Sequence, residues 1–201
     1  MKLYYAPGAC SMSPHIVLRE AGQKFDLVKV DLGTHKTESG ADFYKINPKG
    51  AVPALELDNG EVLTEGAVIV QYVGDHAKNT QLMPAAGSME RVRENETLNW
   101  IGAEFHKSMG SLFNPALAEK AGDIIKTRIG GQLKYLDGRL QGKDYLVGSH
   151  FTAADAYAFT ILGWGQHVGV DVNTYPNVKA YIGRIAARPS VQATLKAEGL
   201  M

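Results

Sequence analysis

Residues 4–14 read Tyr4-Tyr5-Ala6-Pro7-Gly8-Ala9-Cys10-Ser11-Met12-Ser13-Pro14 and contain the only cysteine of the chain. Aromatic residues at the start of this stretch favour a short strand over 2–5, and the Pro-Gly pair ends it. Apolar residues from Ile16 onward favour a helix that Gly22 closes. The sequence therefore predicts that Cys10 lies where a strand passes into a helix. Free backbone N–H groups and the positive end of the helix dipole face that position.

A cysteine at such a junction has two interpretations. The field of a helix amino terminus lowers the pKa of a thiol below its ordinary value of ~8.5, and it equally stabilises the thiolate of a small molecule docked beside it. The alternative is a buried cysteine without chemical function, which is the commoner case for a single cysteine at an unspecified place. Its position at the strand-to-helix junction favours a functional Cys10.

The composition excludes several classes of function. The chain contains 21 Lys and Arg against 21 Asp and Glu, so no charge excess predicts binding to nucleic acid or to an anionic membrane. No apolar run approaches the ~20 residues of a membrane span, and Pro7-Gly8 interrupts the apolar start that a signal peptide needs. One cysteine permits no intramolecular disulfide, which is typical of a reducing compartment. We therefore predict a cytoplasmic globular protein, and we assign it no metal site.

The first 77 residues are predicted to form a small α/β domain. Its signals follow the order strand, helix, strand, then a β-hairpin at Asp58-Asn59-Gly60-Glu61, then a helix. Strong turn chemistry at Asn47-Pro48-Lys49-Gly50 ends the helical turns expected before it. After the first strand and helix, we expect a strand over 27–32, a polar loop over 34–42, helical turns over 43–46, strands over 54–57 and 62–64, and a helix over 65–76.

Residues 78–87 are predicted to be a linker, and residues 88–201 an all-helical domain. Ser88 is placed to cap a long helix, which Asn114-Pro115 stops. Its apolar residues recur at three- and four-residue spacing, at Leu98, Ile101, Phe105, Met109 and Leu112. Further helices are expected over 118–140, 151–164, 178–187 and 190–198.

Thr152 and Asp155 have the spacing of a capping box at the start of an apolar helix, with Asp in place of the usual Glu or Gln. A catalytic carboxylate is the alternative interpretation of Asp155. The cap is favoured, because the helix that follows is apolar enough to lie at the centre of the domain. We therefore expect the loss of Asp155 to impair folding rather than turnover.

These segments together resemble the cytosolic glutathione S-transferases, and within them the bacterial beta class. The resemblance covers essentially the whole chain and implies a thioredoxin-like, glutathione-binding α/β domain, followed by an all-α domain that carries the electrophile site. It also implies a homodimer that uses glutathione as a co-substrate and no other cofactor. Four stretches carry it: Met1-Lys2-Leu3-Tyr4-Tyr5 with Pro7-Gly8-Ala9-Cys10-Ser11, then Asn47-Pro48-Lys49-Gly50-Ala51-Val52-Pro53-Ala54-Leu55, Leu63-Thr64-Glu65-Gly66-Ala67, and Ala197-Glu198-Gly199-Leu200.

The resemblance assigns glutathione contacts to two places in the first domain. Val52-Pro53 resembles the family's cis-proline turn, whose exposed backbone pairs with the cysteinyl part of the ligand as an added strand. Glu65 and Gly66 open a helix whose free N–H groups suit the γ-glutamyl carboxylate, while the Glu65 carboxylate receives the ammonium group. On the residues alone, Pro53 is alternatively a strand start, and Glu65 a first-turn acid favoured by the helix dipole.

By the same resemblance, the long helix faces the thiol site. Asn99, Ala103 and His106 lie on one stripe of an α-helix. Glutathione contacts are expected from Asn99 and from 103–106, which adds Glu104 and Phe105, and some of them come from the partner subunit of the dimer. His106 is expected to orient or deprotonate a thiol, or to stabilise a leaving group. A single helical histidine is, however, more often structural.

Other side chains near these motifs are weighed for the same site. His35 stands where the family often has a lysine for the glycyl carboxylate, and a histidine holds that group only while protonated, ordinarily below about pH 6.5. A surface-loop histidine is the alternative. Ser11 is the hydroxyl expected within reach of a docked sulfur. Tyr4 and Tyr5 are expected to pack in the core rather than to act as the catalytic tyrosine of other classes.

The predicted reaction adds the glutathione thiolate to apolar electrophilic small molecules, as in detoxification. An apolar pocket beside the thiol is expected from residues that are equally well explained as core, namely Phe105, Met109, Phe113 and Trp164. One alternative is a glutathione-dependent thioltransferase, peroxidase or reductive dehalogenase with Cys10 as nucleophile, since Ser13 occupies the second position of a C-x-x-C motif. Another is a ligand-binding module without enzymatic activity.

Overall fold

The computed structural model describes residues 1–201. The first part of the chain forms a five-stranded sheet with the strand order β3-β2-β1-β4-β5. β1 runs parallel to β2, and the other neighbouring pairs are antiparallel. The elements are β1 (Lys2–Tyr5), α1 (Met12–Glu20), β2 (Asp26–Asp31), β3 (Lys36–Thr37), the 3-10 turn η1 (Phe43–Lys45), β4 (Ala54–Glu56), β5 (Val62–Thr64) and α2 (Gly66–His76).

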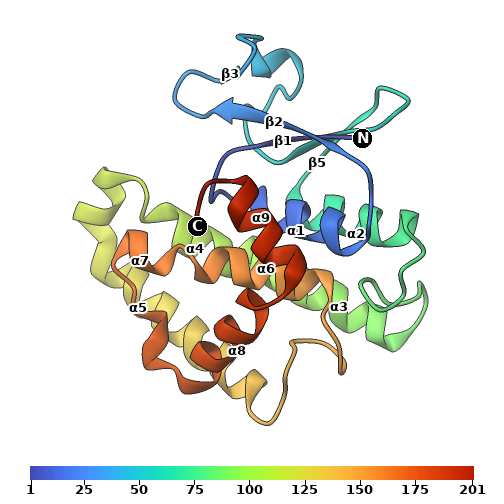
Figure 1. Ribbon diagram of the computed structural model, residues 1–201. Helices are drawn as coiled ribbons and strands as arrows, with labels where there is room; N and C mark the ends of the chain where they lie inside the picture. The colour runs from blue at the N-terminus through green and yellow to red at the C-terminus, as the bar shows by residue number, and fades with distance from the viewer.

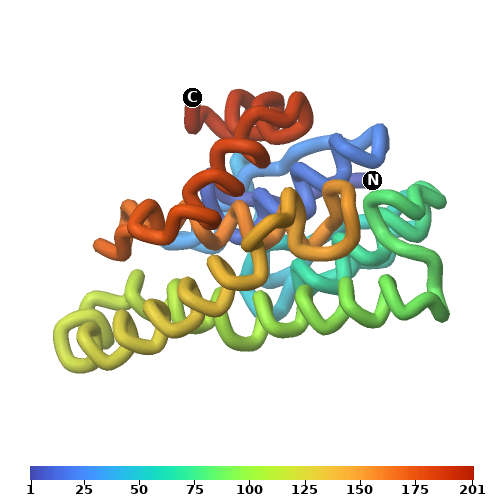
Figure 2. Tube along the Cα trace, turned by 90° about the horizontal axis from the view of Figure 1, so that it is seen from below, coloured from blue at the N-terminus to red at the C-terminus, as the bar shows by residue number.

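The rest of the chain is helical apart from its connections. Figure 1 shows the sheet at the top, α1 and α2 beneath it, and α6 at the centre of the helical part. In Figure 2 the green trace of α3 and α4 crosses the molecule, and the yellow α5 returns beside it. The elements are α3 (Met89–Trp100), the π-helical turn η2 (Ile101–Phe105), α4 (His106–Ser111), α5 (Pro115–Leu140), α6 (Ala153–Leu162), α7 (Gly165–Val168), the 3-10 turn η3 (Val172–Thr174), α8 (Pro176–Ala186) and α9 (Pro189–Ala197).

The observed elements confirm the predicted order of an α/β part followed by helices. α2 ends at His76 and α3 begins at Met89, on either side of the predicted linker. The exact division into 1–77, 78–87 and 88–201 stays a prediction. None of the helices combines the length and the hydropathy that crossing a membrane requires.

One predicted loop contains a strand. We expected 34–42 to be a polar loop, but Lys36–Thr37 form β3 and pair antiparallel with β2, Thr37 opposite Val30 and Lys36 opposite Asp31. The strand has two residues at the edge of the sheet, which is too short for an alternating pattern to be visible. Its pairing is decided by the exposed edge of β2 and not by its own sequence.

The long helix predicted from Ser88 begins as expected and is then interrupted. The Oγ atom of Ser88 accepts a hydrogen bond from the Arg91 N–H at 3.1 Å. The backbone then takes a π-helical turn over Ile101–Phe105 before α4 begins. Such a turn inserts a residue and rotates the side chains that follow it. Asn99 and Ala103 are exposed and His106 is half-buried, so the single stripe predicted for these three residues stays a prediction.

One apolar core joins the sheet to the helices. It contains 39 buried residues and extends from Leu3 in β1 to Val191 in α9. All residues of α6 are buried, so this helix forms the centre of the core, and α1 packs between it and α9 (Figure 1). Tyr4 and Tyr5 are buried, which confirms that they pack in the interior.

The amino terminus of α6 confirms the predicted capping box. Asp155 Oδ2 accepts the backbone N–H of Thr152 at 2.8 Å and its hydroxyl at 3.0 Å. Asp155 Oδ1 accepts the Leu146 N–H at 3.0 Å and the Tyr181 hydroxyl at 2.9 Å. This fully buried carboxylate therefore holds together the start of α6, the loop before it, and α8.

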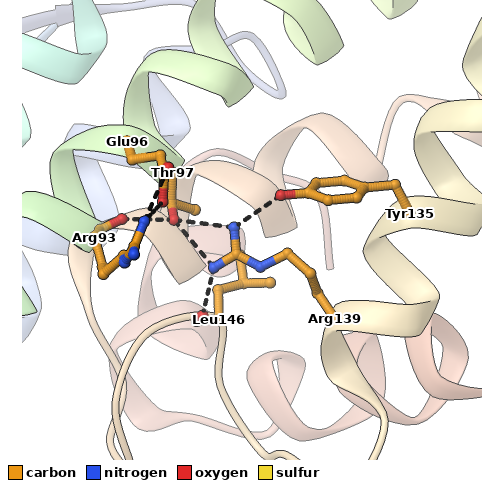
Figure 3. Close-up of polar contacts among 6 residues, drawn as sticks. All are labelled: Arg93, Glu96, Thr97, Tyr135, Arg139 and Leu146. Carbon is orange, nitrogen blue, oxygen red and sulfur yellow. Dashed lines mark hydrogen bonds and ion pairs between the residues drawn. The ribbon is translucent and has the colours of Figure 1, made fainter.

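A second polar junction joins α3 to α5 (Figure 3). The Arg139 guanidinium of α5 donates to Thr97 Oγ1 of α3 at 3.3 Å, to the Tyr135 hydroxyl at 3.3 Å, and to the Leu146 carbonyl at 3.0 Å. Because acceptors of the chain itself surround this guanidinium, we assign the junction a structural role.

Candidate active site

Cys10 lies in the turn between β1 and α1, as predicted, two residues before the helix begins. Its Sγ donates a hydrogen bond to the Val52 carbonyl oxygen at 3.1 Å. The backbone N–H groups of Cys10 and Ser11 face this sulfur and favour its anionic form, and they donate to no carbonyl. The turn thus presents two free donors at a helix amino terminus, a geometry that suits a thiolate.

The Cys10 thiol itself is not activated by this arrangement. Burial raises the pKa of Cys10 to about 11, and the Glu65 carboxylate adds to the rise. The two N–H groups and the Lys107 ammonium group lower the pKa, but by less. In the protein without ligand, the loss of hydration therefore outweighs the field of the helix at the Cys10 sulfur.

Ser11 does not offer its hydroxyl to a ligand. The side chain is fully buried, and its Oγ accepts the Ala6 N–H at 3.1 Å and donates to the Ala6 carbonyl at 3.2 Å. The predicted catalytic role of this hydroxyl is wrong, because both of its hydrogen-bonding functions close the turn. Ser11 contributes its backbone N–H instead.

The Val52-Pro53 turn lies against Cys10. Its peptide bond is cis, as the resemblance implied. The Val52 N–H forms no hydrogen bond within the chain, although the residue is only 7% exposed. A buried backbone donor normally has a partner. The free N–H therefore indicates a place for the backbone of a ligand.

Glu65 directly precedes α2 with a φ of 69°, a conformation uncommon for residues other than glycine. Its carboxylate accepts a hydrogen bond from Lys49 Nζ at 2.6 Å, and this bond lowers the Glu65 pKa. The side chains of Lys49 and Glu65 are 57% and 66% exposed, so the pair is weak and open to a ligand. A Cβ atom at Gly66 would lie 3.8 Å from Pro53 Cγ, so the start of α2 adjoins the proline turn.

His106 is the first residue of α4 and faces α6. Its Nδ1 lies 2.7 Å from the Tyr157 hydroxyl, and its ring meets the Trp164 ring edge-on, with centroids 4.9 Å apart. Burial lowers the pKa of His106 to about 4, with a further decrease from Lys107 and an opposing effect of Glu65. The imidazole is therefore neutral at about pH 7.

Trp164 connects this group back to the turn of Cys10. Its Nε1 donates to the Gly8 carbonyl oxygen at 2.8 Å, and Glu198 accepts the N–H of the same Gly8 at 2.9 Å. A Cβ atom at Gly66 would lie 4.0 Å from Tyr157 Cζ. The residues that surround the Cys10 turn are called the thiol ring below: Cys10, Val52, Pro53, Gly66, Tyr157, His106, Trp164 and Gly8.

Two residues at this site escaped the sequence analysis. Tyr157 lies inside the apolar segment 151–164, where a tyrosine is indistinguishable from a core residue. The only signal for Glu198 was its place in the carboxy-terminal stretch that resembles the family. Neither residue has a local motif that would have connected it to the thiol.

His35 lies beside the loop that leads to Val52 and outside the thiol ring. Its Nδ1 lies 3.0 Å from the Gly50 carbonyl oxygen, and its ring packs on Tyr44 with centroids 4.6 Å apart. Only Nε2 is left for a ligand. The proposed contact of His35 with the glycyl carboxylate stays a prediction.

The contacts expected from α3 and η2 do not join the thiol ring within one chain. Asn99 and Ala103 are exposed, and Glu104 forms an ion pair with Arg128 of α5; these three stay predictions for a dimer. Phe105 is fully buried and stacks on Trp100, with centroids 5.6 Å apart. The ring therefore lies in the core, and the expected contact of Phe105 with glutathione stays a prediction.

The predicted apolar pocket is only partly present. Met109, like Phe105, is fully buried in the core. Phe113, in contrast, is 51% exposed and packs edge-on against Trp164, with centroids 5.4 Å apart. A cavity of about 820 Å³ opens beside Gly8 and Trp164, with apolar lining residues that include Met12, Phe159, Leu162, Ile182, Leu195 and Leu200. Apolar surface next to the thiol ring is thus provided by Phe113 and Trp164.

Two domain-family models match the chain. "Glutathione S-transferase, N-terminal domain" matches residues 1–75, and "Glutathione S-transferase, C-terminal domain" matches residues 103–189. The first match contains the turns of Cys10, Val52 and Glu65, and the second contains His106, Tyr157 and Trp164.

Full-length relatives agree with these matches. Glutathione S-transferase GstA of Escherichia coli O157:H7 is 42% identical over 200 residues, which cover 100% of both chains. Among solved structures, the bacterial beta class glutathione S-transferase of Sphingomonas chungbukensis is 50% identical, with a TM-score of 0.96 and 100% of each chain covered. A sphingomonad glutathione S-transferase complexed with glutathione is 48% identical, with a TM-score of 0.95 and the same coverage.

Proposed function

The chain belongs to the glutathione S-transferase family, and from this membership we propose that it transfers the thiolate of glutathione to apolar electrophilic small molecules. The resemblance to the beta class and the two-part fold are confirmed. The proposal includes glutathione as co-substrate and no other cofactor. One observation carries it: Val52 has an unpaired N–H, and its carbonyl oxygen lies 3.1 Å from the Cys10 sulfur, which the unpaired N–H groups of Cys10 and Ser11 face. An extended peptide with a central thiol uses both kinds of donor at once.

The free donors support one binding mode for glutathione. Its cysteinyl backbone pairs with Val52 as an added strand, and its N–H replaces the Cys10 thiol as the donor to the Val52 carbonyl. The glutathione sulfur then lies at the N–H groups before α1, where the helix dipole favours an anion. At α2, the γ-glutamyl carboxylate takes the first-turn N–H groups, and the ammonium group replaces Lys49 at the exposed carboxylate of Glu65.

Activation of the thiol supplies only a small part of the rate. A decrease of its pKa from ~8.5 to ~6.5 raises the thiolate fraction at pH 7 about 25-fold. The weaker base is also a poorer nucleophile, and a Brønsted slope of ~0.45 reduces the gain by about eightfold. The larger part comes from holding the electrophile beside the sulfur, and the exposed edge of Phe113 against Trp164 supports that role.

The proposal extends to a homodimer. Three apolar side chains on α2 and α3 are half exposed or more, namely Val68 at 50%, Met89 at 67% and Val92 at 51%. A second copy that covers this face removes apolar surface from water. The exposed residues Asn99 and Ala103 continue along the same helical rod and supply contacts across the dimer.

The proposed setting is a reducing cytoplasm. Cys10 is a free thiol, and a protein with no second cysteine gains nothing from an oxidising compartment. The equal numbers of acidic and basic residues support a small-molecule partner rather than nucleic acid or a membrane surface.

The test compares two reactions in the Cys10→Ser variant. Conjugation of glutathione to an aryl halide is expected to stay within about tenfold of the parent chain, because the donors that hold the ligand sulfur are backbone groups. Loss of conjugation together with loss of glutathione-dependent disulfide reduction would assign the nucleophile to Cys10, as in a thioltransferase or reductive dehalogenase. Retention on immobilised glutathione without turnover of any electrophile would indicate a ligand-binding module.

A further inference from the structure

Gly110 is a glycine inside a helix at the edge of the candidate active site. It lies in α4 and does not have the positive φ that favours glycine. A Cβ atom at this position would meet no atom closer than 3.6 Å, which is an ordinary van der Waals contact. Neither the backbone conformation nor close packing therefore requires glycine here, although alanine is the more stable residue inside a helix.

The surroundings of Gly110 distinguish it from a glycine such as Gly131 of α5. A Cβ atom at Gly131 would have no heavy atom within 4 Å, so that position faces open space. A Cβ atom at Gly110 would lie 3.6 Å from Trp164 Cζ3, 3.6 Å from His106 Cδ2 and 3.9 Å from His106 Nε2. The side chain that Gly110 lacks would therefore cover two residues of the thiol ring.

Gly110 lies between two aromatic rings on the same side of the chain. His106 precedes it by four residues in α4, and the Phe113 N–H donates to the Gly110 carbonyl oxygen at 3.2 Å, one turn further on. The rings of His106 and Phe113 both meet Trp164 edge-on, with centroids 4.9 Å and 5.4 Å from it. Gly110 itself is half-buried. A flat aromatic molecule placed over Gly110 would therefore contact several rings at once, and aromatic pairs are favourable beyond the area that they bury.

We infer that Gly110 is a specificity-determining residue of the electrophile site: it leaves room for a two-ring aromatic electrophile, which a side chain at this position would exclude. The inference rests on the proposed function for the reaction. In that reaction the electron pair of the glutathione thiolate forms a bond to a ring carbon of the electrophile. A leaving group such as chloride departs with the electron pair of the bond that breaks. Gly110 takes no part in these steps and acts only on which electrophiles reach the sulfur.

Thermal stability separates this role from a structural one. Gly110→Ala is expected to raise Tm by about 1–3 °C, because alanine is the better helix former and its Cβ atom fits without a clash. Gly131→Ala, at an exposed position of α5, is the matched control and should raise Tm by a similar amount. A lower Tm in Gly110→Ala would show that the fold itself requires glycine and would overturn the inference.

The activity test uses two electrophiles that differ by one fused ring, chlorodinitrobenzene and chlorodinitronaphthalene. The measured quantity is the ratio of kcat/KM for the two-ring chloride to kcat/KM for the one-ring chloride. Gly110→Ala is expected to lower this ratio about tenfold and Gly110→Leu about 100-fold, because small changes of volume in an apolar site have effects of this size. Gly131→Ala should leave the ratio unchanged. An unchanged ratio in Gly110→Ala would overturn the inference, as would a parent chain that conjugates only the one-ring chloride.

Binding without turnover distinguishes the inference from the proposed function. Dinitronaphthalene keeps both rings and lacks the leaving group, so equilibrium dialysis measures its affinity without a reaction. Its Kd is expected to rise about tenfold in Gly110→Ala and to stay unchanged in Gly131→Ala. Absence of conjugation by the parent chain with either chloride would overturn the proposed function, while the Kd of dinitronaphthalene would still test the space at Gly110. An unchanged Kd in Gly110→Ala would overturn the inference.

Discussion

At the scale of single residues, burial and helix field act on the Cys10 sulfur with opposite sign. The N–H groups of Cys10 and Ser11 favour the anion, but burial raises the pKa to about 11. The same two N–H groups are open to a ligand thiolate, and we propose that they serve it better than the resident thiol. This balance supports the proposal that the site binds the sulfur of a ligand.

Alkylation of Cys10 tests this balance. It is the only cysteine, so its reaction with iodoacetamide reports its thiolate directly. The rate is expected to be slow at about pH 7 and to rise about tenfold per pH unit, with no plateau in the range where the protein stays folded. Lys107→Gln is expected to slow the reaction further, because the Lys107 charge lowers the pKa. Lys120→Gln, an exposed change on α5, is the control. A plateau near the ordinary thiol pKa would contradict the prediction.

Glu94, like Asp155, is a buried acid, and it does not belong to the thiol ring. Its Oε1 accepts the Ala154 N–H at 2.7 Å, and its Oε2 has no partner. Burial, and to a smaller extent the nearby Asp155, raise the pKa of Glu94 to about 7. Asp155 is shifted in the same direction, to about 6, chiefly by burial. These acids make the stability of the protein depend on pH.

The sign of this dependence follows from linkage. An acid with a higher pKa in the folded than in the unfolded chain binds more protons when folded, so stability falls as pH rises between the two values. For Glu94 this window runs from 4.5 to about 7. Glu94→Gln is expected to remove the loss of stability that ionisation of Glu94 causes, which is up to about 3 kcal/mol at pH 8. The difference in Tm between about pH 5 and pH 8 should therefore become smaller. Glu96→Gln, an exposed neighbour on α3, is the control and should leave that difference unchanged.

The residues of the site differ in how far the sequence reveals them. Cys10, Val52-Pro53 and Glu65 lie in local turn motifs, so a few adjacent residues are enough to predict the conformation around each of them. The Ser11 hydroxyl bonds to Ala6 within the turn and is not available to a ligand. The spacing of residues along the sequence does not show that the turn needs these hydrogen bonds. Tyr157 meets His106 only because α6 packs against η2, the turn directly before His106, and neither segment of sequence shows that contact.

At the scale of elements, the start of α6 concentrates hydrogen bonds on one carboxylate. Asp155 accepts bonds from the Thr152 N–H and hydroxyl, the Leu146 N–H and the Tyr181 hydroxyl. An ordinary cap contributes about 1 kcal/mol. Here the loss of the acceptor would leave several buried donors unsatisfied, each at about 1–3 kcal/mol.

Asp155→Ala is therefore expected to lower the free energy of unfolding by about 3 kcal/mol or more, measured by urea denaturation. The kcat/KM of the fraction that remains folded should be unchanged, because Asp155 does not belong to the thiol ring. Asp123→Ala, at an exposed position of α5, is the matched control. Unaltered unfolding together with lost turnover would restore the catalytic interpretation of Asp155.

The predictability of an element followed its length. The helix predicted over 178–187 is observed as Pro176–Ala186, and that over 190–198 as Pro189–Ala197, because two or more turns display their apolar period. β3 and α7 are too short to show any period. The π-helical turn of η2 leaves the apolar spacing unchanged, so the sequence predicted the burial of Phe105 but not the turn itself.

At the scale of the whole molecule, the end of the chain controls the turn at its beginning. Arg19 Nε donates to His15 Nε2 at 3.0 Å, so the proton of His15 resides on Nδ1, which donates to Glu198 Oε1 at 2.8 Å. The other oxygen of Glu198 accepts the Gly8 N–H at 2.9 Å. The Gly8 peptide is thus held by Glu198 at its N–H and by Trp164 at its carbonyl, and the thiol turn depends on helices far along the chain.

Glu198→Ala tests whether the hydrogen bond between Glu198 and Gly8 affects the binding of glutathione. The change leaves the buried His15 N–H and the Gly8 N–H without acceptors, so the free energy of unfolding is expected to fall by about 3 kcal/mol. Hydrogen exchange at the Gly8 amide should accelerate, and KM for glutathione should rise more than kcat falls, because the donors before α1 lose their fixed position.

Glu198→Gln retains one acceptor oxygen and is expected to restore part of both effects, whereas Glu90→Ala on the exposed start of α3 should change neither. A stability loss in Glu198→Ala with unchanged exchange at Gly8 and unchanged KM would confine Glu198 to folding. Stability and KM for glutathione are expected to change together, because the single carboxylate of Glu198 accepts both the bond from His15 and the bond from Gly8, in the turn that holds Cys10.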